Sequence, residues 1–71
     1  MFGYYINLDK RVDRNDHMKN LIKTTPFLEK VERMSAMYSE TYGVGCMMSH
    51  IKCLTNLLKR NDEYYIILED D

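Results

Sequence analysis

The sequence predicts an α/β protein with a three-stranded parallel sheet and the element order β-α-β-α-β. Two observations favour this class. The apolar run at residues 64–68 is made of strand-forming residues in succession, which is typical of a strand buried on both faces of a parallel sheet. Strand-like and helix-like patterns also alternate along the chain, and that order indicates crossover connections between parallel strands.

The size and composition of the chain set limits on both fold and function. Its 71 residues allow one domain, and a chain this short buries only ~60% of its unfolded surface. Hydrophobic residues make up 45% and charged residues 30%, a composition that indicates a folded chain. The net charge is −1 with both signs mixed, so we expect no nucleic-acid partner.

The first third of the chain predicts a strand followed by a helix. Aromatic and β-branched residues favour a buried strand at 3–7. A charged turn follows, and either Asp9 or Asp13 is a candidate N-cap for a helix that begins near residue 12. Pro26 ends this helix because the residue before a proline avoids the α region. Its thin apolar stripe comprises Val12, Met18, Leu21 and Ile22.

The middle of the chain predicts a short strand and a longer helix. Alternating residues favour a strand near 30–34, close to an edge of the sheet. A loop follows, and a helix then runs from Val44 until Asn61 and Asp62 close it. We expect its apolar face to enter the core, together with Met34. That face comprises Val44, Met47, Met48, Ile51, Leu54, Leu57 and Leu58.

Two cysteines lie in the predicted long helix. Cys46 and Cys53 are seven residues apart, so their Cα atoms would be about 10 Å apart, too far for a disulfide. His50 shares their face, a spacing that suggests zinc. A structural zinc site needs four ligands and a second segment, so we expect a packed helix face instead, with His50 buried or hydrogen-bonded. Reduced thiols, no signal-peptide pattern and no membrane-spanning stretch favour a cytoplasmic location.

Three consecutive acids, Glu69, Asp70 and Asp71, end the last predicted strand. Open α/β sheets bind ligands at the carboxyl ends of their strands. Three acids repel one another unless water, a cation or basic groups offset the repulsion. One interpretation is a divalent-cation site for a phosphorylated ligand, and the other is a solvated strand terminus. The triplet alone favours the solvated terminus.

The turn after the first strand strengthens the ligand interpretation. The carboxyl ends of the first and last strands meet at one edge of a parallel sheet, so this turn should lie near the acids. Basic groups at a helix N-terminus suit a diphosphate, and acids opposite them suit the metal that bridges its phosphates. The alternative is a solvated capping turn, and neither GxGxxG nor a P-loop is present. The turn residues concerned are Asn7, Asp9, Lys10, Arg11 and Arg14.

The start of the long helix offers two further features. Gly43 and Gly45 either let the backbone approach an anion or simply begin the helix flexibly. Tyr38 and Tyr42, in the preceding loop, either stack on a base or sugar or anchor the loop. Anchoring is the simpler expectation.

Three segments in this order resemble glycosyltransferase family 25, which includes bacterial lipooligosaccharide galactosyltransferases and procollagen galactosyltransferases. Between the first two, Arg33-Met34-Ser35-Ala36 fits the short strand that precedes the family's loop. The three segments are Tyr5-Ile6-Asn7-Leu8-Asp9-Lys10-Arg11 with Asp13-Arg14, then Gly43-Val44-Gly45-Cys46 with Ser49-His50, then Ile67-Leu68-Glu69-Asp70-Asp71.

The resemblance implies that residues 1–71 are the donor-binding half of a GT-A, Rossmann-like domain. Its implied activity is transfer of a hexose, galactose or glucose, from a nucleotide-diphosphate sugar to a glycan or protein acceptor, as in lipopolysaccharide biosynthesis. It also implies Mn²⁺ or Mg²⁺, with Asp71 and Glu69 as metal ligands. The implied nucleotide-sugar-binding residues are Asn7, Asp9, Arg11, Arg14, Glu69 and Asp70.

Length separates this chain from the family it resembles. Family members continue well past the acidic motif, into the acceptor site and the base that activates the acceptor hydroxyl. We therefore expect the 71-residue chain alone to be inactive as a transferase, and no catalytic residue is assigned. A second chain that completes the domain is one partner to consider. The alternative is a catalytically inactive α/β module that binds a nucleotide weakly or only associates with a partner chain.

Overall fold

The computed structural model describes residues 1–41 and 43–70, and the predicted α/β class and element order are confirmed. The prediction lacked one element, a single 3₁₀ turn after the first helix. That turn begins at Pro26, whose fixed φ suits the first position of a helix. The elements are β1 (Phe2–Asn7), α1 (Val12–Lys23), η1 (Pro26–Leu28), β2 (Val31–Ser35), α2 (Val44–Leu57) and β3 (Tyr65–Glu69).

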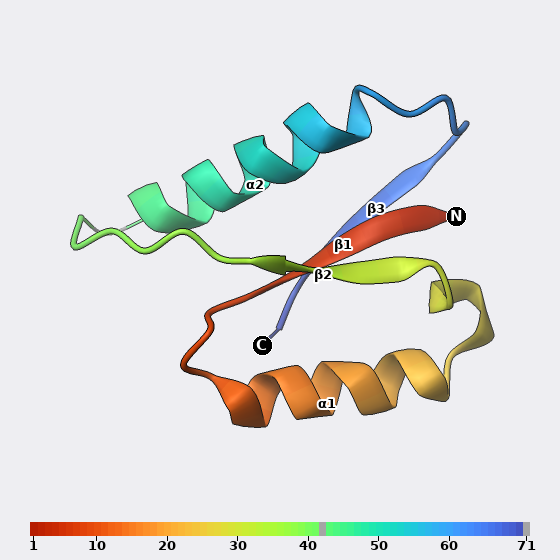
Figure 1. The fold of residues 1–71 in the computed structure, drawn as a ribbon, viewed down its shortest axis with the longest axis horizontal. Helices are drawn as coiled ribbons and strands as arrows, with labels where there is room; N and C mark the ends of the chain where they lie inside the picture. Colours follow the sequence, from red (N-terminus) through yellow and green to blue (C-terminus); the bar gives the residue numbers. More distant parts are fainter. Residues whose placement is uncertain (42, 71) are drawn as a thin grey trace.

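The three strands form one parallel sheet in the order β2-β1-β3. β1 is central, and β2 lies at an edge, as predicted. The sheet lies between the two helices, with α1 on one side and α2 on the other (Figure 1). Because all strands run the same way, their carboxyl ends meet at one edge of the sheet.

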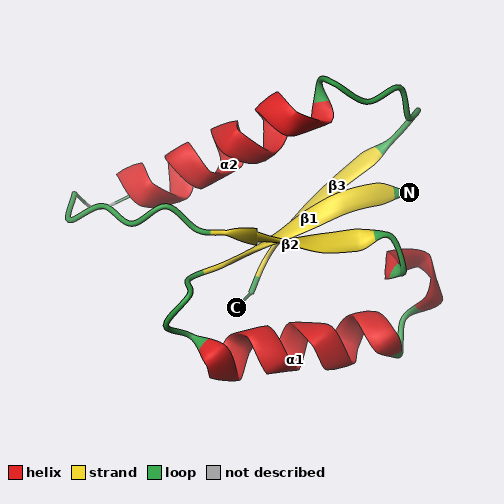
Figure 2. Cartoon of the chain, in the orientation of Figure 1, coloured by secondary structure: helices red, strands yellow, loops and turns green. Residues whose placement is uncertain are grey.

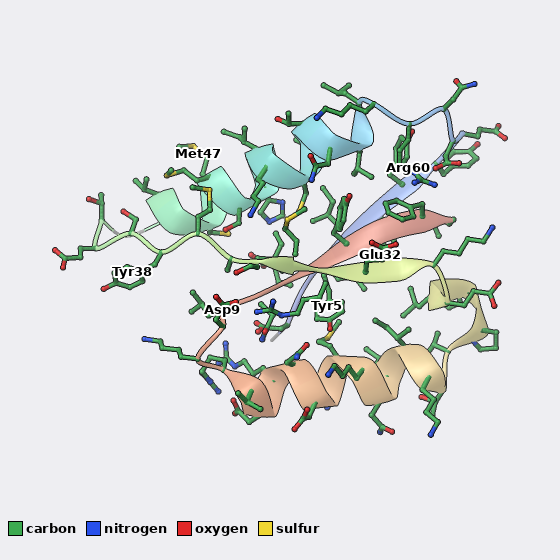
Figure 3. All side chains as sticks on the ribbon, viewed as in Figure 1. Tyr5, Asp9, Glu32, Tyr38, Met47 and Arg60 are labelled. Carbon is green, nitrogen blue, oxygen red and sulfur yellow. The ribbon has the colours of Figure 1, made fainter. Side chains whose placement is uncertain are left out.

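The alternation of side chains along β1 divides the core into two halves. Tyr5 faces α1 (Figure 3) and belongs to a cluster with Met18 and Val31. Ile6 faces the other side and packs with Met34 and Cys53. Successive strand residues point to opposite faces, so one central strand supplies the core under both helices.

The orientation of α2 differs from the prediction. Its buried residues are Ser49, Cys53 and Leu57, which are four residues apart along the helix. Most of the predicted apolar face is exposed instead: Met47, Met48, Ile51, Leu54 and Leu58. Leu57 belongs to the predicted face, whereas Ser49 and Cys53 lie beside it. Ser49 bonds to Met37 and Gly45 lies against the Met37 carbonyl oxygen, so this side of α2 faces the loop before it.

The burial of β3 also differs from the prediction. Tyr65–Leu68 are only partly buried, and Glu69 is exposed. The expected strand buried on both faces is therefore wrong for the described chain. The physical reason is position, since β3 pairs with β1 on one side only within residues 1–41 and 43–70.

The helix ends show two smaller corrections. The N-cap position of α1 is Arg11, and neither Asp9 nor Asp13 caps the helix, because Asp9 bonds to β2 and Asp13 to Arg11. α2 ends at Leu57, before the predicted stop at residues 61–62. Of the predicted stripe on α1, Met18 and Ile22 pack into the core, whereas Val12 and Leu21 are exposed.

Candidate functional site

A cleft of about 530 Å³ lies at the carboxyl edge of the sheet. Its walls come from the ends of β1 and β3, the loop at residues 36–41 and the first turns of α2. Figure 2 shows the loops that leave β1 and β2 at this edge. The position agrees with the general rule that α/β sheets bind ligands beyond the carboxyl ends of their strands.

Asn7, at the end of β1, ties three segments together and is only 1% exposed. Its Nδ2 donates to Asp70 Oδ2 at 2.7 Å and to the carbonyl oxygen of Arg11 at 3.1 Å. Its Oδ1 accepts from Arg33 Nε at 3.0 Å. A side-chain amide suits this position because it offers donors and an acceptor without a charge of its own.

Arg14 reaches Asp70 from the first turns of α1. The guanidinium Nη1 lies 3.7 Å from Asp70 Oδ1, and both residues line the cleft. The topology predicted that the turn after the first strand would meet the closing acids, and the contacts of Asn7 and Arg14 with Asp70 confirm this. Their role in binding a nucleotide sugar stays a prediction.

Asp9 and Arg11 make other contacts. Asp9 Oδ1 accepts from Arg33 Nη2 at 2.6 Å and from Ser35 Oγ at 2.7 Å, which ties the β1 turn to β2. Arg11 forms two hydrogen bonds to Asp13, at 3.0 and 2.9 Å. That pair raises the pKa of Arg11, and the nearby charge of Asp70 adds to the effect.

Arg33 is the residue that the sequence analysis missed. Its guanidinium holds Asn7 and Asp9 together, so it organises the turn that borders the cleft. A signal existed in the sequence, because Arg33 lies two residues before the end of a strand whose carboxyl end meets the same sheet edge. Charged residues in a short edge strand are common, however, so the pattern alone does not separate the two roles.

The closing acids point to different sides of the sheet. Asp70 lies on the α1 side with Asn7, whereas Glu69 faces α2. Cys46 Sγ donates to Glu69 Oε1 at 2.9 Å, and His50 Nε2 lies 3.6 Å from the same oxygen. These two contacts, the cysteine first, lower the pKa of the Glu69 carboxyl. Asp71, the other predicted metal ligand, lies outside the described residues.

The first turn of α2 is fixed to the loop before it. Ser49 Oγ donates to the carbonyl oxygen of Gly45 at 2.8 Å and accepts from the backbone N–H of Met37 at 2.8 Å. A Cβ on Gly45 would lie 2.6 Å from the Met37 carbonyl oxygen, and Gly43 has φ of +80°. Gly45 therefore allows the helix backbone to approach the loop closely, and Gly43 allows a left-handed turn. Neither role is a flexible start of the helix.

Aromatic and thiol residues complete the surroundings of the cleft. Tyr38 is 70% exposed, lines the cleft and has the Lys10 ammonium 5.8 Å from its ring centroid, so it does not anchor the loop through burial. Tyr42 lies outside the described residues. Neither cysteine forms a disulfide, as predicted. The packed-face prediction holds for Cys53, where burial raises the pKa of the thiol, but Cys46 is exposed.

The contact between Arg33 and Asp9 gives a prediction that titration can test. Hydrogen bonds from Arg33, and then from Ser35, lower the pKa of Asp9 below its ordinary value. We expect Arg33→Gln to raise that pKa, and Ser35→Ala to raise it less. Because the pKa of Asp9 is lower in the folded chain than in the unfolded chain, its contacts stabilise the fold at pH values above the unfolded-state pKa. This stabilisation is lost as the pH falls through the folded-state pKa. NMR titration of the Asp9 carboxyl measures the shift, and an unchanged pKa in Arg33→Gln would contradict it.

The fold and the cleft define an α/β protein with carboxylates and an arginine at the carboxyl edge of a parallel sheet. Within this class, the sequence model of glycosyltransferase family 25, described as an LPS biosynthesis protein, matches residues 41–71. The match supports the resemblance over the second and third segments and indicates a glycosyltransferase-like chain. It covers somewhat less than half of the sequence, and the segment at residues 5–14 lies outside it.

The other comparisons add no relatives. No curated protein and no solved structure matches the chain. Across residues 1–41 and 43–70, neither α1 nor α2 has the length and apolar character needed to span a bilayer.

Proposed function

We propose that the cleft binds the nucleotide-diphosphate part of a hexose donor, and that the chain is the donor-binding part of a family 25 hexosyltransferase. One observation carries the proposal. Arg14 from α1 and Asp70, the residue after β3, meet in a cleft whose remaining wall comes in part from the segment that matches the family.

Arg14 supplies the positive charge for the diphosphate. Its side chain is 37% exposed, and its ion pair with Asp70 is long at 3.7 Å, so its other guanidinium donors remain accessible to phosphate oxygens. Asn7 holds Asp70 at 2.7 Å and so keeps the carboxylate beside Arg14. The exposed ring of Tyr38 offers a surface on which a base or sugar can stack.

The carboxylates fit a hard divalent cation. Glu69 and Asp70 both line the cleft, and oxygen ligands are those that Mn²⁺ and Mg²⁺ prefer. We propose Glu69 and Asp71 as the metal ligands, as the family resemblance implies. When bound, the cation would offset the charge that develops on the leaving diphosphate.

The resemblance of the sequence to the family guides the choice of donor and acceptor. We propose a uridine diphosphate hexose, with galactose or glucose as the sugar, and a glycan or protein as the acceptor. The described residues contain no group that we assign as the base for the acceptor hydroxyl. The proposal is therefore one of donor binding, with transfer requiring groups beyond this cleft.

A thermal-shift titration with uridine diphosphate, with and without Mn²⁺, tests the proposal. A ligand at 100 times its Kd stabilises the folded state by about 2.7 kcal/mol. We expect the unfolding midpoint to rise by several degrees or more with Mn²⁺ present, and to rise much less without it. Circular dichroism comes first, to establish that the chain is folded.

Variants locate the effect in the cleft. Asp71→Asn should remove the Mn²⁺-dependent part of the shift, and Arg14→Gln should weaken nucleotide protection at every Mn²⁺ concentration. Lys19→Gln is the matched control, since it removes one positive charge from an exposed position of α1 outside the cleft. If the folded protein shows no change of its unfolding midpoint at millimolar nucleotide, the donor-site proposal is wrong.

A second candidate function is association with a partner chain, without catalysis. The specific observation that favours it is the apolar face of α2, where Met47, Ile51, Leu54 and Leu58 are each more than half exposed. β3 also pairs with β1 on one side only within the described residues, which leaves an edge for another strand. The titration separates the two functions, because association alone predicts no nucleotide-dependent shift.

A further inference from the structure

A thiol, an imidazole and a carboxylate converge beside the cleft from two different elements. Cys46 and His50 lie one turn apart on α2, and Glu69 lies at the end of β3. Their ligand atoms all lie within 4.8 Å of one another. Glu69 Oε1 is 2.9 Å from Cys46 Sγ and 3.6 Å from His50 Nε2, so one carboxylate oxygen sits close to both of the other groups.

We propose that Cys46, His50 and Glu69 form a zinc site with three protein ligands. Bonds of about 2.0–2.3 Å at tetrahedral angles place the ligand atoms of zinc roughly 3.3–3.7 Å apart. The Glu69–Cys46 and Glu69–His50 distances of 2.9 and 3.6 Å lie close to that range, and the Cys46 and His50 ligand atoms lie within 4.8 Å of each other. Side-chain movements of about an ångström would therefore bring all three atoms to one ion. Three protein ligands plus one open position is the arrangement of zinc sites that bind water or a substrate.

The donor set favours zinc over the harder cations. A thiolate and an imidazole are soft or borderline ligands, and they bind Zn²⁺ far better than Mn²⁺ or Mg²⁺. The thiol must lose its proton to become a ligand, and this proton passes to solvent when the metal binds. Cys46 and Glu69 are exposed and His50 is partly exposed, so an ion can reach the site from solvent.

The frame around the cluster is already ordered. Ser49 lies between Cys46 and His50 in the sequence and is only 1% exposed. Its hydrogen bonds to Gly45 and Met37 hold this turn of α2 in place. A site whose ligands come from fixed elements loses less freedom on binding than one that has to assemble.

The sequence pattern pointed to a different set of ligands. The spacing of Cys46, His50 and Cys53 suggests zinc, but Cys53 is fully buried beneath α2 in the cluster with Ile6 and Met34. Glu69 takes its place as the third ligand, and only the packing of β3 against α2 brings it there. The expectation of a packed face rested on the need of a structural zinc site for four ligands and a second segment. β3 supplies the second segment, and the three protein ligands fit a site with one open position instead.

Binding of Co²⁺ and Zn²⁺ to the purified chain tests the site directly. Co²⁺ reports a thiolate ligand through a sulfur-to-cobalt charge-transfer absorption, and Zn²⁺ displaces it. We expect the wild type to show this absorption with one metal per chain. We expect Cys46→Ser to lose it, and His50→Gln to bind Zn²⁺ at least tenfold more weakly, since even outer-shell changes cost 10–100-fold in metal affinity.

Two control variants match these changes in residue type. Cys53→Ala removes the other thiol, and His17→Gln removes the other imidazole, at an exposed position of α1. Both should retain the cobalt absorption and the zinc affinity of the wild type. Circular dichroism confirms that each variant is folded, and the wild-type spectrum tests the site even where a variant does not fold.

Two results would overturn the zinc site. One is a folded wild type that shows no thiolate-to-cobalt absorption, and the other is Cys46→Ser with unchanged zinc affinity. Glu69 is a ligand in both proposals, so zinc binding and the Mn²⁺-dependent nucleotide shift are measured separately, each without the other metal. Asp71→Asn distinguishes the two proposals, because it should abolish the Mn²⁺-dependent nucleotide shift and leave zinc binding intact.

Discussion

Replacing Gly3 with alanine is expected to destabilise the chain by more than about 3 kcal/mol, at the upper end of the range for overpacking. A Cβ at this position would overlap the carbonyl oxygen and the Cγ2 of Ile66 on β3. Gly3 lies in the central strand and is paired with Val31 on one side and Ile66 on the other. The clash is with backbone, so no change of side-chain rotamer relieves it, and the β1–β3 pairing has to open.

A loss of this size matters because the chain is small. Domains have about 0.05–0.15 kcal/mol of stability per residue, which gives roughly 4–10 kcal/mol for a chain of this length. Urea denaturation followed by far-UV circular dichroism measures the change. Gly43→Ala is the matched control, because Gly43 has φ of +80° but no neighbouring atom within 4 Å of the added Cβ. That variant should lower the free energy of unfolding by only about 1–2 kcal/mol, because alanine is less stable than glycine in a left-handed backbone conformation by that amount.

The two glycine variants distinguish a steric cause from a conformational one. If Gly3→Ala is less costly than Gly43→Ala, the close approach of β1 and β3 at Ile66 is not the reason for a glycine in the central strand. The same result would place the sheet register in doubt, since the contact with Ile66 follows from the pairing of Gly3 with that residue.

Replacing Asn7 with aspartate is expected to cost about 2–4 kcal/mol at neutral pH, as the introduction of a buried, poorly paired charge does. The new carboxylate would face the Asp70 carboxylate at the 2.7 Å distance where the Asn7 amide now donates. Arg33 offsets part of the charge, because its Nε already donates to Asn7 Oδ1 at 3.0 Å. The hydrogen bond to the Arg11 carbonyl oxygen is lost as well.

The pH dependence of the Asn7→Asp variant has a definite sign. Two carboxylates in contact raise the pKa of one of them in the folded state. The folded variant then binds more protons than the unfolded chain as the pH falls toward that pKa, so its deficit relative to wild type should shrink at acidic pH. Urea denaturation at pH 7 and pH 4 measures this difference.

Asn20→Asp is the control for the change of an amide to a carboxylate. Asn20 is exposed on α1, so its substitution should change stability by no more than about 0.5 kcal/mol. Equal costs for the two variants would contradict the central role of Asn7. Under the proposed function, the Asn7→Asp variant should also lose nucleotide protection at pH 7, because Asp70 is no longer held beside Arg14.

Local patterns in the sequence were sufficient for the elements and their order. The aromatic and β-branched residues of β1, the apolar run of β3, Pro26 after α1 and the alternation of the two patterns each reflect short-range preferences. The parallel sheet followed from that order, and the meeting of Asn7 with Asp70 followed from the sheet. The candidate edge for ligand binding was therefore predictable from the residues alone.

Contacts between distant residues decided the rest. Whether α2 buried its Met47 face or its Cys53 face depended on the loop contacts of Ser49 and Gly45, which residue periodicity does not record. The joining of Arg33 to Asn7 and Asp9, and of Cys46 and His50 to Glu69, depended on the strand order β2-β1-β3 and on which side of the sheet each residue faces. The physical reason is that sequence patterns encode local conformation and burial, whereas a site is made by side chains that only packing brings within bonding distance.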